Sequence, residues 1–149
     1  MVESKGTSLK WVASETLKVS ARASRTECLR QISEGVGRML EATQAEEVSI
    51  EGAFFFKNAK TALILGEARG AAMAACAIRG IPIYEYAPRR VKQAVVGHGN
   101  ADKAQVRQMI MQLMGIREEP QEDVGDALAL AICHLHSRSG HAELGPKPI

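Results

Sequence analysis

Two acidic residues at the start of one apolar segment carry the strongest chemical signal in this sequence. Asp123 and Asp126 are three residues apart at the head of a helix predicted over 122–137, so their Cβ atoms would lie about 5–6 Å apart on one face. Carboxylates this close repel each other unless positive charge lies between them. The helix dipole supplies about 0.3–1 kcal/mol of compensation, and a divalent cation that prefers oxygen ligands would supply far more. From this segment alone, a metal site and simple N-terminal capping are both open.

A third acid, Glu51, lies at the end of a short predicted strand, VSIEG at 48–52. The strand is otherwise apolar enough for the centre of a sheet, where a carboxylate without a partner is rarely tolerated; the alternative is an edge strand with Glu51 in solvent. An acid at a strand end and an aspartate pair opening a helix suit metal-assisted phosphodiester hydrolysis, in which two ions about 3.5–4 Å apart activate water and stabilise the leaving oxygen. Glu51, Asp123 and Asp126 are therefore the candidate catalytic and metal-binding residues.

Basic and acidic residues are segregated in the second half of the chain. The formal net charge of +2 does not by itself indicate a polyanionic partner. Between residues 79 and 107, however, six basic residues against two acidic ones leave +4, and between 116 and 126 one basic residue against five acidic ones leaves −4. A basic surface beside an acidic metal cluster is expected where a phosphate backbone is held and cut. For each basic residue taken singly, a solvated helix face is the alternative.

Three consecutive phenylalanines, Phe54, Phe55 and Phe56, precede Lys57. Successive side chains of an extended segment point to opposite faces, so burying all three rings is difficult. An exposed ring beside a cation could stack on, or wedge between, unpaired bases, which is worth about 1–3 kcal/mol per base. The alternative is that all three rings lie in a subunit contact or a corner of the core.

Alternating strands and helices would have to position these residues. Hydrophobic periodicity and capping signals predict helices over 24–43 with Ser24 as N-cap, over 58–79 with Gly80 as the residue after its C-cap, over 101–114 and over 122–137. Pro88 is predicted to open a short basic helix. The predicted strands are 9–19 (with a break), 48–52 and 81–86. This alternation indicates an α/β fold.

Composition fits one domain. The chain has 149 residues, of which 46% are hydrophobic and 24% charged, as in ordinary globular proteins. It shows neither a signal peptide nor an apolar run of membrane-spanning length, which predicts a cytoplasmic protein without a membrane partner. Cys28, Cys76 and Cys133 are predicted to be small core residues, because they are far apart and lie in apolar helical patterns.

Three blocks together resemble the RuvC family of Holliday junction resolvases: 48–70, 84–106 and 122–136. The resemblance implies an RNase H-like fold with a five-stranded mixed sheet flanked by helices. It also implies a homodimer that nicks four-way DNA junctions symmetrically in recombination and repair. The implied cofactor is Mg²⁺, with two ions per active site and Mn²⁺ as a substitute, and the implied partners include a branch-migration helicase complex.

The resemblance also assigns roles to individual residues. The glutamate after the apolar strand, here Glu51, is implied as a metal ligand. The two acids that open the last helix, here Asp123 and Asp126, are implied as ligands too. The implied DNA contacts are Phe54 at the junction centre and two lysines, Lys92 and Lys103; Lys57 and Arg89 are added as DNA-binding candidates.

One departure from the family pattern matters for the chemistry. The family begins with a hydrophobic strand that ends in Asp-Pro-Gly and supplies a fourth ligand, and the sequence has no such motif. Residues 1–137 are therefore predicted to be one N-terminally incomplete nuclease domain without the first two strands, and 138–149 a flexible polar tail. Three functions follow in order of preference: a junction-cutting endonuclease, an inactive junction-binding protein, and an α/β domain that binds a protein through its phenylalanines.

Overall fold

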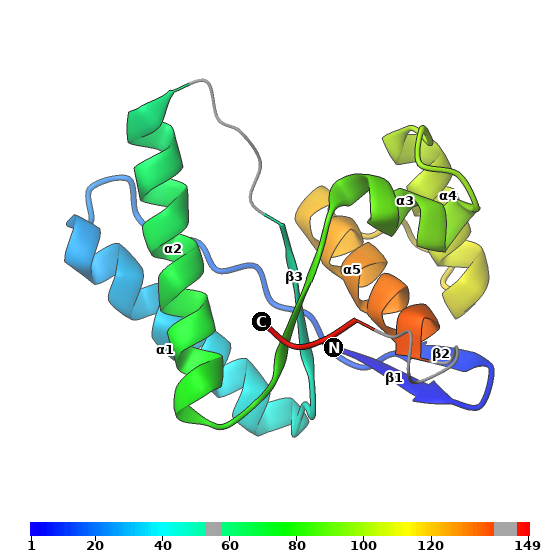
Figure 1. Cartoon of the computed structure of the whole chain (residues 1–149), viewed down its shortest axis with the longest axis horizontal. Helices are drawn as coiled ribbons and strands as arrows, with labels where there is room; N and C mark the ends of the chain where they lie inside the picture. Colours follow the sequence, from blue (N-terminus) through cyan, green and yellow to red (C-terminus); the bar gives the residue numbers. More distant parts are fainter. Residues whose placement is uncertain (53–57, 139–145) are drawn as a thin grey trace. The chain divides into compact units, whose positions relative to one another are not determined.

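The computed structural model describes residues 1–52, 58–138 and 146–149 (Figure 1). The chain divides into two compact units. Unit 1 comprises Met1–Ser14, Ser49–Gly52 and Tyr84–Ile149, and unit 2 comprises Glu15–Val48 and Ala53–Ile83. The candidate acids Glu51, Asp123 and Asp126 all belong to unit 1. The single-domain organisation over 1–137 stays a prediction, and the predicted flexible tail falls largely on 139–145, outside the described residues.

Unit 1 begins with a hairpin of β1 (Val2–Lys5) and β2 (Ser8–Trp11). The strands are antiparallel, with Val2 opposite Trp11 and Lys5 opposite Ser8. Gly6, with φ +61°, supplies the left-handed conformation that the tight turn between them requires. The prediction of one interrupted strand over 9–19 is confirmed only in part: residues 9–11 lie in β2, whereas residues 12–19 form no strand. Strand β1 was not predicted, because four residues are too short to register as a strand before their partner is known.

Three helices complete unit 1: α3 (Pro88–Val96), α4 (Lys103–Met114) and α5 (Glu122–Arg138). Pro88 occupies the first turn of α3, as predicted, and Gly97 and Gly115 end α3 and α4 with positive φ. Side chains at the centre of this unit, including Ile110 and Ile132, are fully buried. The core therefore lies between the helices and fixes the start of α5, where both aspartates are located.

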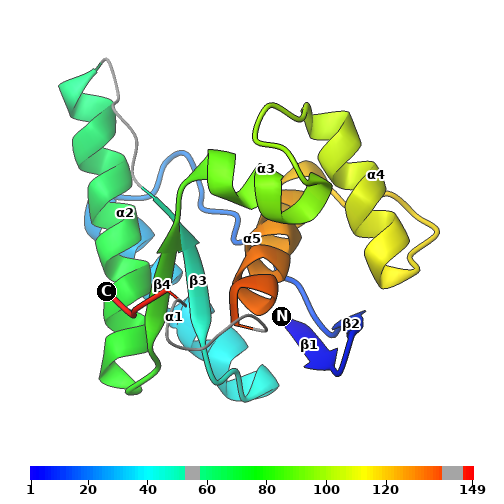
Figure 2. The ribbon, with the colours of Figure 1, turned by 45° about the vertical axis from the view of Figure 1, so that its right-hand side comes forward.

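Strands β3 (Val48–Glu51) and β4 (Ile83–Tyr86) form a second pair, seen side by side in Figure 2. The Val48 amide donates to the Pro82 carbonyl at 3.0 Å and the Gly52 amide to the Tyr86 carbonyl at 2.9 Å. From the first of these hydrogen bonds to the second, the donor and the acceptor positions both move four residues toward the C-terminus, so the strands are parallel.

The described strands thus make two two-stranded sheets. The single five-stranded mixed sheet implied by the resemblance is not present in the part of the chain that the structure describes. Such a sheet needs a strand bonded to both pairs, and none of the described strands does this. Strand β3 has β4 as its one described neighbour, and Glu51 at its end is exposed, so the edge-strand alternative describes this segment better than a central strand.

Unit 2 consists mainly of two packed helices, α1 (Arg25–Thr43) and α2 (Ala59–Ile78). Both were predicted within one residue at each end. Ser24 caps α1 by accepting a hydrogen bond from the Glu27 amide at 3.2 Å, and Asn58 caps α2 in the same manner. Gly80, with φ +67°, follows the C-cap of α2 as expected.

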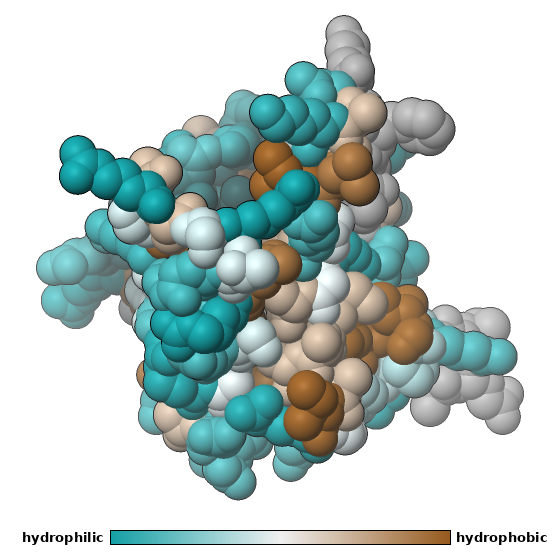
Figure 3. Space-filling view, turned by 90° about the vertical axis from the view of Figure 1, so that its left-hand side faces the viewer, coloured by the Kyte–Doolittle hydropathy of each residue, from teal (hydrophilic) through white to brown (hydrophobic). Residues whose placement is uncertain are grey.

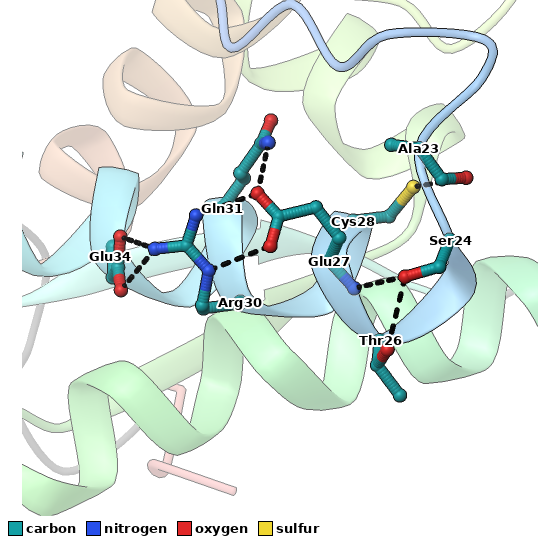
Figure 4. Close-up of polar contacts among 8 residues, drawn as sticks. All are labelled: Ala23, Ser24, Thr26, Glu27, Cys28, Arg30, Gln31 and Glu34. Carbon is teal, nitrogen blue, oxygen red and sulfur yellow. Dashed lines mark hydrogen bonds and ion pairs between the residues drawn. The ribbon is translucent and has the colours of Figure 1, made fainter.

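The first turns of α1 hold a network of charged side chains (Figure 4). Arg30 donates to Glu27 at 2.6 and 2.8 Å and to Glu34 at 2.6 and 2.7 Å, and Gln31 donates to Glu27 at 2.6 Å. The hydrogen bonds from Arg30 and then Gln31 lower the pKa of Glu27 to about 2. The network therefore favours the ionised carboxylate near the helix N-terminus, where the dipole favours it too.

Helix α2 is apolar but poorly covered by the other residues that the structure describes. Among the described helices it alone is long and apolar enough to span a membrane on length and composition, which is weak evidence by itself. Glu67, near the middle of α2, forms an ion pair with Arg25 of α1. This charged side chain of α2 is therefore already paired within unit 2. Several large apolar side chains remain exposed, namely Leu63, Ile64, Leu65 and Ile78, and hydrophobic atoms gather over this helix in Figure 3.

Candidate active site

The start of α5 presents both aspartates to the surface. Asp123 and Asp126 are exposed, whereas Val124 and Gly125 between them are buried. The amide of Gly125 donates to the Gln121 carbonyl at 2.8 Å, which extends the first turn of the helix back to the preceding loop. Because the two carboxylates are three residues apart in the first turns, they share the exposed side of the helix end. Carboxylate oxygens of this kind, together with water and phosphate oxygens, form the donor set that Mg²⁺ prefers.

Lys103 lies beside this acidic end. It opens α4, and its Nζ forms an ion pair with Oε1 of Glu122, the first residue of α5. The pKa of Lys103 is raised by the hydrogen bond and charge of Glu122 and then by the charge of Asp126. The pKa of Glu122 is lowered, mainly by Lys103. The structure therefore brings one predicted DNA-contacting lysine close to the acids of α5.

Helix α3 carries the other predicted cations. Arg89 is exposed and Lys92 half-buried. The stem of Arg89 lies over Gly99, where an added Cβ would be 2.4 Å from the Arg89 Cγ. Gly99 thus leaves room for Arg89 against the loop between α3 and α4, while Gly97 ends α3.

Glu51 lies at the end of β3, in the same compact unit as the α5 acids. Strand β4 runs alongside it, and the Glu85 carboxylate approaches the space above Gly52. Within residues 1–52, 58–138 and 146–149, no group of three or more His, Cys, Asp or Glu side chains is close enough to hold a metal ion. The convergence of Glu51 with Asp123 and Asp126 on one ion therefore stays a prediction. The α5 pair fits a divalent cation by its chemistry, since Mg²⁺ commonly takes only one or two carboxylates from the protein.

The predictions for Phe54 and Lys57 cannot be compared with the structure, since both residues lie outside the described ranges.

A buried aromatic cluster supports the site and was missed from the sequence. Tyr86 and His134 are hydrogen-bonded at 2.8 Å between the phenol oxygen and Nδ1. The Tyr84 ring lies 4.5 Å from the His134 ring, and the Arg138 guanidinium lies over Tyr84 at 5.7 Å. The alternation of Tyr84 and Tyr86 along one strand was the available signal, since both side chains are buried.

Cysteines and histidines of α5 divide between core and surface. Cys133 and His134 are buried, and His136 is exposed and lies 3.1 Å from the Ala94 carbonyl. Cys76 is also buried and Cys28 partly so, and all three cysteines are free. This distribution confirms Cys76 and Cys133 as small core residues, whereas Cys28 is only half-buried.

Comparison with known proteins connects these features to one family. The family model described as "Crossover junction endodeoxyribonuclease RuvC" matches residues 1–134. The protein of that name from Halorhodospira halophila is 46% identical over 128 residues, covering 86% of this chain and 77% of the relative. The one from Clostridioides difficile is 41% identical over 138 residues, covering 92% and 82%.

Solved structures agree with the sequence comparison. The chain is similar to T. thermophilus RuvC in complex with a Holliday junction substrate, with a TM-score of 0.91, 32% identity, and coverage of 99% of this chain and 89% of the other. A second structure of Thermus thermophilus RuvC gives a TM-score of 0.87 at 34% identity. The similarity spans both compact units.

Proposed function

As a member of the RuvC family of crossover junction endodeoxyribonucleases, the chain is a Holliday junction resolvase, and we propose that Asp123, Asp126 and Glu51 form its metal-binding catalytic centre. The observation that carries the proposal is the exposed aspartate pair at the start of α5, beside the cation of Lys103. Bound magnesium, two ions per site, would supply a nucleophilic water and stabilise charge on the leaving oxygen.

The residues around this centre have separable tasks in the proposal. Asp123 and Asp126 present their carboxylates from a helix end that the core of unit 1 holds in place, so little reorganisation is needed to bind a cation. Glu51 would contribute from the end of β3. Lys103, Lys92 and Arg89 would contact phosphates, and Phe54 and Lys57 the centre of the junction. Hydrolysis would leave a 5′-phosphate and a 3′-hydroxyl.

Replacing one aspartate with its amide tests the assignment. We expect Asp123→Asn to abolish cutting of a synthetic four-way junction in Mg²⁺ and to leave junction binding intact, because the amide is a poor ligand yet keeps the shape of the side chain. Glu118→Gln, which removes the same charge from the exposed turn before α5, is the matched control and should cut normally. Retained cutting by Asp123→Asn would exclude its role.

The same assay separates cutting from binding. The second candidate is a junction-binding protein whose described acids, which form no preformed three-acid group, do not complete a working metal centre. Incubating the unmodified chain with a four-way junction and Mg²⁺ distinguishes the two. Nicked product supports the catalytic centre, whereas a bound, uncut junction supports the second candidate.

The proposal includes a homodimer that acts on both sides of the junction. Its support is the exposed apolar surface of α2, where Leu63 and Ile78 are 62% and 81% exposed. Aliphatic side chains exposed together on one helix mark an interaction surface. A second copy is the partner proposed here, since a junction with two equivalent strands to cut suits a twofold enzyme. A helicase complex that migrates the junction would be a further partner.

A further inference from the structure

An ion pair joins the beginnings of helices α4 and α5. Lys103 and Glu122 are the first residues of the two helices, and Nζ of Lys103 contacts Oε1 of Glu122. Glu122 immediately precedes Asp123, one of the proposed metal ligands. The pair therefore places a cation at the helix end that carries the proposed catalytic carboxylates.

The Lys103 end of this pair is attached to well-fixed backbone. A capping box precedes Lys103: the Asp102 carboxylate accepts from the Gln105 amide at 2.8 Å, and the Gln105 side chain accepts from the Asp102 amide at 3.0 Å. A lysine side chain has four rotatable bonds and samples many rotamers when exposed. The contact with Glu122 selects among these rotamers, although the Lys103 side chain is 64% exposed.

The selected rotamer places the Lys103 ammonium against the first residue of α5, which is next to Asp123 in the chain. After Glu122, the charge of Asp126 is the next cause that raises the pKa of Lys103. Charge effects between exposed groups decay within about one Debye length. The contact with Glu122 therefore holds Lys103 where the charge of Asp126 reaches it.

We propose that Glu122 is a positioning residue that holds Lys103 at the Asp123–Asp126 end of α5, so that a DNA phosphate arriving at these carboxylates meets a pre-oriented cation. The inference rests on the proposed function, to which it adds a residue, because it takes Lys103 as a phosphate contact. Glu122 itself touches neither DNA nor metal in this role.

The chain provides a matched control for this ion pair. Arg107 lies one helical turn beyond Lys103 on α4 and pairs with Glu119, with 2.7 Å between Nη1 and Oε1. Glu119 precedes α5, and its side chain is 58% exposed, close to the 62% of Glu122. Glu119→Gln thus removes one charge and one α4 ion pair while leaving Lys103 and Glu122 in place.

The first experiment reads the contact directly in metal-free protein. The ¹⁵N signal of the Lys103 ammonium, assigned by its loss in Lys103→Met, is expected to exchange slowly with water in the unmodified chain. Glu122→Gln should move this signal to the position and exchange rate of free lysine, whereas Glu119→Gln should leave it unchanged. An unchanged Lys103 signal in Glu122→Gln overturns the proposal, whatever the outcome for metal binding by Asp123.

The second experiment asks whether the contact matters for cutting. In low salt, Glu122→Gln should lower kcat about two- to fivefold, the range that an exposed ion pair can supply, with little change in KM. In a Lys103→Met background the same substitution should have no further effect. Additive losses in the double variant, or a rise in kcat for Glu122→Gln alone, contradict a positioning role. If Asp123→Asn still cuts, the metal site is wrong, and the metal-free signal still reports on the contact.

Discussion

The phenol oxygen of Tyr86 lies 2.8 Å from Nδ1 of His134, in a buried pair that joins strand β4 to helix α5. Strand β4 is also bonded to the end of β3, where Glu51 lies, through the Gly52 amide. The pair thus connects the backbone around one proposed ligand to the helix that carries the other two. Both side chains are at most 5% exposed, so a lost hydrogen bond would not be replaced by bulk water.

Removing the Tyr86 hydroxyl should therefore destabilise the protein. We expect Tyr86→Phe to lower the free energy of unfolding by about 1–3 kcal/mol, because a ring nitrogen of His134 is left buried without its partner. Urea denaturation measures this. The double variant Tyr86→Phe/His134→Leu should lose less free energy of unfolding than the two single variants lose together, because removing both polar partners leaves no unsatisfied group. Strict additivity would contradict the importance of the pair.

The low pKa of Glu27 predicts how the stability of the fold changes in acid. Its folded pKa is about 2 against an ordinary 4.5, so between these values the unfolded chain binds more protons than the folded one. The contribution of the ionised Glu27 carboxylate to the free energy of unfolding is complete above pH 4.5 and is lost as the pH falls toward 2. Comparing urea midpoints at pH 5 and pH 3 should show a smaller drop for Glu27→Gln than for the unmodified chain.

Glu46→Gln is the control for that comparison, because it removes an exposed acid between α1 and β3. The urea midpoint of Glu46→Gln should fall between pH 5 and pH 3 as much as that of the unmodified chain. The Glu27 effect should also shrink in high salt, since the ion pair with Arg30 is exposed. An identical pH dependence in Glu27→Gln and the unmodified chain would rule out this source of acid sensitivity.

Two glycines on neighbouring helices should respond to alanine in opposite ways. A Cβ at Gly37 would lie 2.5 Å from Nη2 of Arg79, whereas a Cβ at Gly66 would meet nothing within 4 Å. Gly66→Ala should stabilise the chain by about 0.5–1 kcal/mol through helix propensity. Gly37→Ala should lack this gain because the Arg79 guanidinium must leave Glu41, which it contacts at 2.6 Å. Thermal unfolding of the two variants in parallel tests the difference.

The exposed face of α2 predicts the oligomeric state. Leu63→Glu should weaken self-association by at least about tenfold, because burying a leucine at an interface is worth about 1.5–3 kcal/mol. Sedimentation analysis of the 16.1 kDa chain would show a shift toward monomer. Val12→Glu, which adds the same charge at a 47% exposed site outside α2, should leave the mass distribution unchanged. A monomeric unmodified chain would remove the dimer from the proposal.

Local signals in the sequence predicted most helices and their ends. Ser24, Gly80 and Pro88 act on backbone groups within one helical turn, so their effect is readable from neighbours in the chain. The acidic pair at 123 and 126 was likewise visible, because residues three apart in the first turns of a helix necessarily share a face. Spacing along the chain therefore determined the candidate acids and the helices that present them.

Tertiary structure alone decided which side chains meet. The pairing of β3 with β4 and the contact between Lys103 and Glu122 join residues whose separation in the chain carries no distance information. Tyr86 and His134 are 48 residues apart, and only packing of α5 against β4 buries them together. Hydrogen-bond pairing and close packing act across space, and for that reason the sequence determined the chemistry available to the site and the fold determined its arrangement.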